Sequence, residues 1–176
     1  MDYMSYGEIA RELGKDFVRY KVGFETHAPP SLHTKTLRRV GDEVEERHVL
    51  ALHRMVQQLQ YDPVVHGRKA VYATFDSIFK DGAYSWGRIV MVYVFAARLA
   101  KYCRTRGRDK IVVEDLGRYA GDYVAYHLKH WIEEQGGWVD HFCETFRTQP
   151  RASHSYIAIT TVIALCLACM IALRHM

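Results

Sequence analysis

The chain has 176 residues, 49% of them hydrophobic, which is enough to bury the core of one domain. Its formal net charge of +4 is too small to indicate nucleic-acid binding, because no basic-aromatic motif accompanies it. The excess of cations gathers between residues 98 and 110, and we interpret it as a solvated loop between helices rather than as a patch for nucleic acid or anionic lipid.

Helical periodicity runs through the first half of the chain, with almost no strand-like alternation. Residues 5–22 carry apolar side chains at steps of three and four, which predicts one amphipathic helix. The same spacing recurs over 34–60, with a break near His48. A shorter helix is predicted over 69–79, and the Asp81-Gly82 pair that follows it predicts a turn.

An almost uninterrupted apolar helix is predicted over 86–104, with Arg88 near its start. A helix that is apolar all round is buried in a protein core or in a membrane, so Arg88 should lie where a dry interior meets a surface. A guanidinium in such a place favours a two-pronged carboxylate partner. That carboxylate belongs either to the same chain or to an aspartate of a binding partner.

The second half of the chain is also predicted to be helical, with one helix over 112–129 and two short helices over 131–135 and 138–146. Gly136-Gly137 forms the hinge between the short helices. We therefore expect an all-α fold, in which a helical bundle formed by residues 1–147 wraps round the central apolar helix. Residues 148–155 are expected to be a linker.

Residues 156–173 form a run of 18 residues without a charge. As a helix this run would span about 27 Å, close to the roughly 30 Å hydrocarbon core of a bilayer. We expect a transmembrane tail anchor that inserts after synthesis. A buried core helix is the alternative.

Enzyme and cofactor motifs are missing from the sequence. There is no phosphate-binding glycine loop, no Gly-x-Ser-x-Gly elbow, no His-Glu-x-x-His and no Cys/His zinc framework. Cys166 and Cys169 form a C-x-x-C inside an apolar run, which is typical of packing rather than of redox or metal chemistry. We therefore expect that the protein is not an enzyme and binds no cofactor or metal. We also expect it to face the reducing environment of the cytosol.

Four separated segments carry recognisable motifs in a fixed order: 11–22, 37–44, 81–90 and 131–138. In that order they resemble the fourth, third, first and second homology motifs of the Bcl-2 family of apoptosis regulators. Ser85 stands where the first motif usually has asparagine. The uncharged run at 156–173 lies where this family places its tail anchor.

The resemblance implies a Bcl-2-like helical bundle of the pro-survival branch, most similar to the myeloid-cell-leukaemia and Bcl-x type inhibitors. Such a protein would bind the amphipathic third-motif helix of pro-apoptotic relatives, both helix-only and executioner members, and would also form homo- or heterodimers. It would sequester them at the mitochondrial outer membrane, or also at the endoplasmic reticulum, facing the cytosol. A pore-forming executioner of the same fold and a tail-anchored scaffold are the alternatives.

The same resemblance implies a hydrophobic groove bounded by the helix that carries the third motif, the 69–79 helix and the start of the central helix, with the Trp138 segment closing one end. Arg88 would pair with the ligand's aspartate and set its register, while apolar stripes would provide affinity. Core packing is the alternative role for the apolar residues, and a solvated side chain is the alternative for His48, which could otherwise tune binding near neutral pH. The expected ligand-helix-binding residues are Val40, Val44, His48, Leu52, Met55, Leu59, Phe75, Ile78, Ser85, Gly87, Arg88, Val92 and Phe95.

Overall fold

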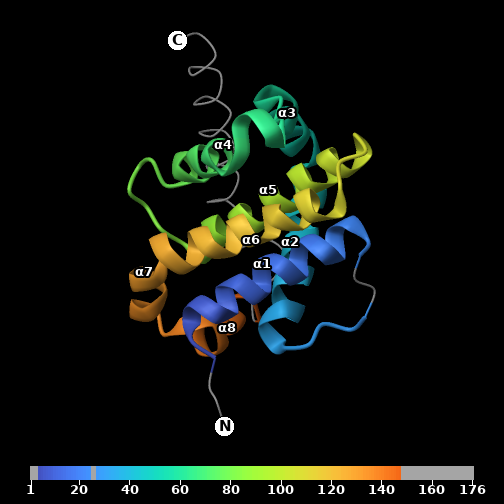
Figure 1. Ribbon diagram of the computed structural model, residues 1–176. Helices are drawn as coiled ribbons and strands as arrows, with labels where there is room; N and C mark the ends of the chain where they lie inside the picture. The colour runs from blue at the N-terminus through green and yellow to red at the C-terminus, as the bar shows by residue number, and fades with distance from the viewer. Residues whose placement is uncertain (1–3, 25–26, 148–176) are drawn as a thin grey trace.

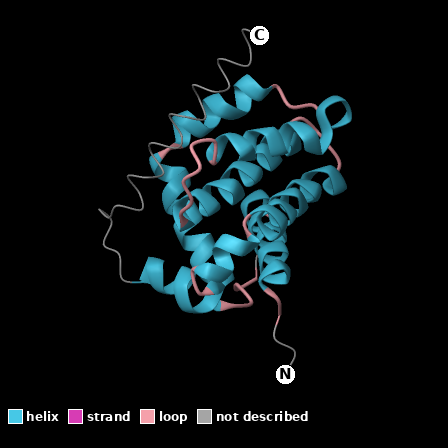
Figure 2. Cartoon of the chain, turned by 90° about the vertical axis from the view of Figure 1, so that its left-hand side faces the viewer, coloured by secondary structure: helices cyan, strands magenta, loops and turns pink. Residues whose placement is uncertain are grey.

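The computed structural model describes residues 4–24 and 27–147, and within these ranges the chain is helical without strands (Figures 1 and 2). In chain order the elements are α1 (Tyr6–Val22), α2 (Leu32–Arg47), α3 (Val49–Leu59), α4 (Pro63–Ile78), α5 (Trp86–Thr105), α6 (Lys110–His127), α7 (Lys129–Glu134), a π-helical segment η1 (Trp138–Phe142) and α8 (Cys143–Arg147). None of the helices in the described ranges is long and apolar enough to cross a membrane. The linker and tail anchor expected at 148–173 lie outside the described residues.

Helix α5 is the centre of the bundle (Figure 1). All its residues from Trp86 to Ala97 are buried, and the helix packs against α6, α1 and α2. Burying each large apolar side chain contributes about 1.5–3 kcal/mol to folding. The prediction that surrounding helices bury the central apolar helix is therefore confirmed.

Helix α1 and helix α6 pack so closely that glycine is required at their contact. A Cβ atom added to Gly117 would lie 2.5 Å from the carbonyl oxygen of Gly14, and one added to Gly121 would lie 2.6 Å from the Cα of Arg11. By helix propensity alone, Gly14 weakens α1 by about 1 kcal/mol relative to alanine. Its role in the fold is to let the two backbones approach.

The start of α4 differs from the prediction, because the helix begins at Pro63 rather than at residue 69. The Asp62 side chain accepts a hydrogen bond from the Val64 N–H at 2.9 Å, and Pro63 takes the first helical position, where its missing N–H costs nothing. Gly67, at φ 53°, divides this helix with a kink.

The C-terminal part of the bundle is divided more finely than predicted. The helix expected over 112–129 ends at His127, and α7 begins at Lys129 after the capping residue Leu128. The segment 138–146 is a π-helical turn followed by α8. Gly136 and Gly137 have φ of 83° and 81°, in the left-handed region that glycine adopts without strain. They turn the chain at the predicted hinge.

Candidate functional site

Arg88 lies in the first turn of α5 and is only 7% exposed. The Ser85 hydroxyl caps this turn by accepting a hydrogen bond from the Arg88 backbone N–H at 3.3 Å. The guanidinium donates from Nη1 to Oδ1 of Asp81 at 2.5 Å and from Nη2 to Oδ2 at 2.8 Å. Nη1 also donates to the Ile78 carbonyl oxygen at 2.9 Å. In this conformation the carboxylate partner of Arg88 thus belongs to its own chain.

Asp81 is held opposite Arg88 by the turn between α4 and α5. Gly82 has φ of 73°, its N–H donates to the Phe79 carbonyl, and the Ala83 N–H donates to Oδ1 of Asp81 at 3.1 Å. The hydrogen bonds from Arg88 and then from Ala83 lower the pKa of Asp81 to about 2. Asp81 is therefore ionised throughout the physiological range.

Most of the apolar residues expected in the groove are fully buried. They share one continuous core with the rest of the bundle. Those with at most 1% exposure are Val40, Val44, Leu52, Met55, Phe75, Ile78, Val92 and Phe95. Gly87 is also buried, whereas His48, Leu59 and Ser85 are half-buried. The apolar side chains of α2 and α3, of α4 and of α5 form three stripes, which the structure brings together in this core. Helices α3 and α4 pack against α5, so that the buried side chains of the three stripes are covered in the described part of the chain.

An aromatic cluster lies beside Arg88, at the end of the bundle formed by α7, η1 and α8. The Trp86 ring lies 5.1 Å from the Trp131 ring, 5.3 Å from the Trp138 ring and 5.3 Å from the Phe142 ring. Trp138 is anchored to α1 by a hydrogen bond from Nε1 to the Tyr6 carbonyl at 3.0 Å. The Trp138 segment thus packs against the start of α5, where the resemblance places one end of the groove.

His48 lies at the junction of α2 and α3. Burial, and then the positive charge of Arg47, lower the pKa of His48 below its ordinary value of 6.5. The lowered pKa favours the neutral imidazole. A role for His48 in tuning binding near neutral pH stays a prediction.

Two open cavities lie in other parts of the bundle. One of about 1040 Å³ is lined by the start of α1 and the end of α6, among them Tyr6 and Tyr126. The other cavity, of about 810 Å³, lies between the start of α2 and α8. Val139 and Asp140 of η1 line both cavities. No expected ligand-helix-binding residue lines either cavity.

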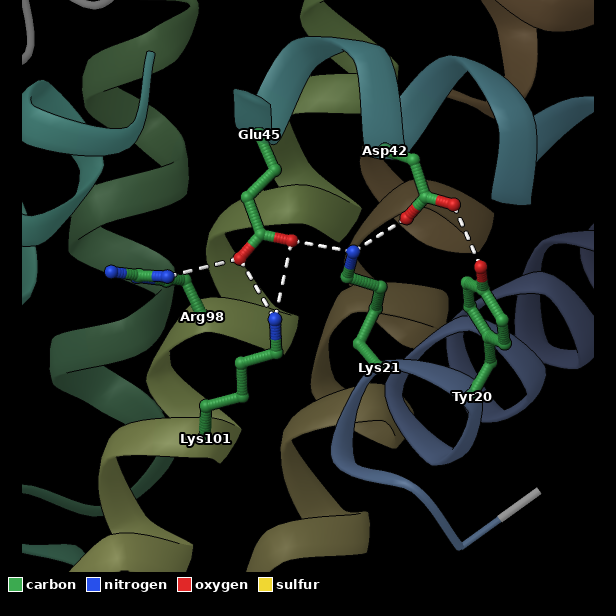
Figure 3. A network of polar contacts seen from close by, with 6 residues as sticks. All are labelled: Tyr20, Lys21, Asp42, Glu45, Arg98 and Lys101. Atoms are coloured by element: carbon green, nitrogen blue, oxygen red, sulfur yellow. Dashed lines mark hydrogen bonds and ion pairs between the residues drawn. The ribbon is translucent and has the colours of Figure 1, made fainter. Parts of the chain in front are cut away.

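A charged network joins α1, α2 and α5 (Figure 3). Lys21 of α1 lies between two carboxylates of α2, 2.5 Å from Asp42 Oδ1 and 2.5 Å from Glu45 Oε2. Glu45 also pairs with Arg98 at 3.0 Å and Lys101 at 2.9 Å, both on α5. Burial alone would raise the pKa of Glu45, but the hydrogen bonds from Lys21 and Lys101 lower it to about 2.

Asp42 stands in the segment that resembles the third homology motif, and its second oxygen is also occupied. The Tyr20 hydroxyl donates to Asp42 Oδ2 at 2.7 Å (Figure 3). This hydrogen bond, followed by burial, raises the pKa of Tyr20. Asp42 thus binds two neighbouring residues of α1, which holds α2 against it.

Comparisons with known proteins agree on one family. A family model described as apoptosis regulator proteins, Bcl-2 family, matches residues 37–138. The chain is 32% identical over 143 residues to Apoptosis regulator Bcl-2 of Gallus gallus, which covers 80% of this chain and 59% of that protein. It is 29% identical over 105 residues to Apoptosis regulator BAX of Mus musculus, which covers 60% of this chain and 52% of that protein. The chain therefore spans less than two thirds of the length of these curated relatives.

Among solved structures, the zebrafish pro-survival protein NRZ in complex with Bad BH3 has the same fold. The TM-score is 0.73 at 25% identity, and the match covers 80% of this chain and 93% of that chain.

Proposed function

The chain belongs to the Bcl-2 family of apoptosis regulators, and we propose that it inhibits apoptosis by binding the amphipathic third-motif helix of pro-apoptotic relatives. The observation that carries this proposal is Arg88, a buried arginine in the first turn of the central helix. Helices α2, α3 and α4, which carry the other apolar stripes, pack against this central helix. The ligand's apolar side chains would enter between the stripes, and its aspartate would meet Arg88. The similarity to a pro-survival protein solved with a Bad BH3 ligand supports this assignment.

Binding requires the stripes to separate, and α3 is the element best suited to move. Only Leu52, Met55 and Val56 of its eleven residues are buried. His48 provides no side-chain hydrogen bond to the start of α3, and the residue that caps the other end is Gln60, a non-glycine residue with φ of 44°. A helix with few buried side chains and weak caps opens at low cost. Displacing α3 would expose Leu52, Met55 and the α5 side chains beneath them.

The charged network favours an inhibitor over an executioner. An executioner inserts its central helices into the membrane, which requires α5 to leave the bundle. Here Glu45 ties Arg98 and Lys101 of α5 to α2, and Lys21 ties α2 to α1. Releasing α5 would separate these partly buried charges and remove the stabilisation of the ionised carboxylate that keeps the pKa of Glu45 low.

The proposed place of action is the cytosolic face of the mitochondrial outer membrane, with the endoplasmic reticulum as a second membrane. This part of the proposal rests on the sequence, because residues 156–173 carry no charge and are long enough as a helix to cross a bilayer. A chain anchored there would hold its partners at the membrane and keep them from assembling.

The experiment that tests the proposal combines binding with membrane permeabilisation. A labelled Bad BH3 peptide is titrated with the chain by fluorescence anisotropy. In parallel, dye-loaded liposomes are exposed to the chain with and without that peptide. An inhibitor binds the peptide and leaves the liposomes intact, whereas peptide-triggered release of dye would identify an executioner.

A further inference from the structure

The pair formed by Asp81 and Arg88 has a consequence for ligand selection. Arg88 has five N–H groups, and three of them are already used by Asp81 and the Ile78 carbonyl. Nε donates to none of the described residues, so only the Nε side of the guanidinium is left for a second carboxylate. The two-pronged Nη1–Nη2 side is occupied.

A ligand carboxylate therefore meets a guanidinium whose charge is already neutralised. If the ligand binds the Nε side, its carboxylate comes to lie near that of Asp81, and the two like charges repel. If instead it takes the Nη1–Nη2 side, it must first break two charge-assisted hydrogen bonds that Asp81 makes. By either route, the carboxylate of Asp81 reduces the favourable binding free energy that the ligand's aspartate contributes at Arg88.

The turn that carries Asp81 makes it a fixed competitor. The Gly82 N–H bond to the Phe79 carbonyl and the Ala83 N–H bond to Asp81 Oδ1 set the carboxylate in place before any ligand arrives. An ordered competitor in the same chain acts at a high effective concentration. It also satisfies Arg88 in the closed state, which removes the cost of a buried unpaired charge.

We propose that Asp81 is a specificity-determining residue. Its carboxylate occupies the side of Arg88 that the ligand's aspartate would otherwise bind. The affinity of the chain for a ligand helix therefore depends less on that aspartate. The inference rests on the proposed helix-binding function. It predicts that the apolar side chains of a ligand helix determine its affinity for this chain more strongly than the ligand's aspartate does.

The test is a two-by-two binding experiment. The chain and its Asp81→Asn variant are each titrated with the Bad BH3 peptide and with the same peptide in which the aspartate proposed to meet Arg88 is replaced by asparagine. The amide oxygen that this substitution introduces remains an acceptor for Arg88 and for the Ala83 N–H, so the turn is retained and a thermal melt checks the fold. Asp109→Asn is the matched control, since Asp109 is exposed and its side chain makes no capping hydrogen bond to α6.

We expect Asp81→Asn to bind the Bad BH3 peptide about fivefold tighter or more, with no such gain for the asparagine peptide. The loss of affinity caused by replacing the ligand's aspartate is then larger in Asp81→Asn than in the parent chain by the same factor. Weaker or unchanged binding by Asp81→Asn would overturn the inference, as would an equal gain in Asp109→Asn. If neither form of the chain binds either peptide, the proposed function itself fails, which is a separate result.

Discussion

Lys21 of α1 and Asp42 of α2 are in direct contact, with Nζ 2.5 Å from Oδ1. Burial alone would lower the pKa of Lys21, but its hydrogen bonds to Asp42 and Glu45 raise it. The contact joins the segment that resembles the fourth homology motif to the segment that resembles the third. In this chain the third-motif helix is therefore docked onto its own bundle.

Glu45 links this contact to α5, and we expect its loss to be costly. Its side chain is 12% exposed and has Lys21, Arg98 and Lys101 as partners. Glu45→Gln should lower the free energy of unfolding by about 2–4 kcal/mol at pH 7, because three cations lose their shared carboxylate. Chemical denaturation measures this loss, and Glu46→Gln, at the neighbouring exposed position, should change stability by less than about 0.5 kcal/mol.

The pH dependence of the same variant is a second test. The pKa of Glu45 is about 2 in the folded chain against 4.5 for an ordinary glutamate. A carboxylate with a lowered folded-state pKa stabilises the fold above its unfolded pKa, and that stability is lost as pH falls toward the folded value. The stability difference between the parent chain and Glu45→Gln should therefore be constant at neutral pH and shrink from about pH 5 downward. A difference that stays constant down to about pH 3 would show that the network does not lower the pKa of Glu45.

Gly14 should tolerate no side chain, although it stands inside a helix. A Cβ at this position would lie 2.9 Å from the backbone nitrogen of Gly121 and closer still to the Gly117 carbonyl. We expect Gly14→Ala to reduce the free energy of unfolding by about 3 kcal/mol, through forced separation of α1 and α6. The matched control is Gly7→Ala in the same helix.

At Gly7 the nearest atoms to an added Cβ are 3.5 Å and 3.6 Å away, which is ordinary contact. Alanine there should stabilise the chain by roughly 0.5–1 kcal/mol through helix propensity. Equal effects of the two substitutions in thermal unfolding would mean that α1 and α6 are not in close backbone contact.

Helix α3 should be the least protected helix of the groove. It lacks a side-chain cap at His48 and buries three side chains, whereas α5 is buried along most of its length. In hydrogen exchange measured by mass spectrometry, we expect the amides of 49–59 to exchange before those of 86–100. Addition of the Bad BH3 peptide should alter exchange in α3 and in the first turns of α5. Uniform protection of α3 and α5 would contradict an opening that begins at α3.

The helices and the family can be predicted from the sequence because both depend on local patterns. Periodicity places the helices at 5–22 and 86–104 within a residue or two, and the break near His48 is confirmed. The predicted start of α4 at residue 69 is wrong, because apolar spacing alone does not identify Pro63 as the first residue of the helix. With Asp62 as the cap before it, the same proline is a start signal.

The state of the groove could not be predicted from the sequence. An apolar stripe shows that a helix face avoids water, but it does not show whether a ligand or the chain's own helices cover that face. Val44, Leu52 and Phe95 are covered by their own bundle in this conformation. The sequence also does not show whether the carboxylate partner of Arg88 belongs to a ligand or to the chain itself. The Asp81-Gly82 turn, seven residues before Arg88, is the feature that could have indicated a partner in the same chain.

The most direct test of the central claim is calorimetric titration of the 176-residue chain with the Bad BH3 peptide, alongside Arg88→Gln. Glutamine keeps a donor for the Ile78 carbonyl but removes the charge, and a thermal melt confirms that the variant is folded. The account predicts submicromolar binding, about −8 kcal/mol or stronger, and a loss of about tenfold in Arg88→Gln. Undetectable binding of the parent chain, or equal affinity in the folded variant, would contradict a groove that recognises its ligand through Arg88.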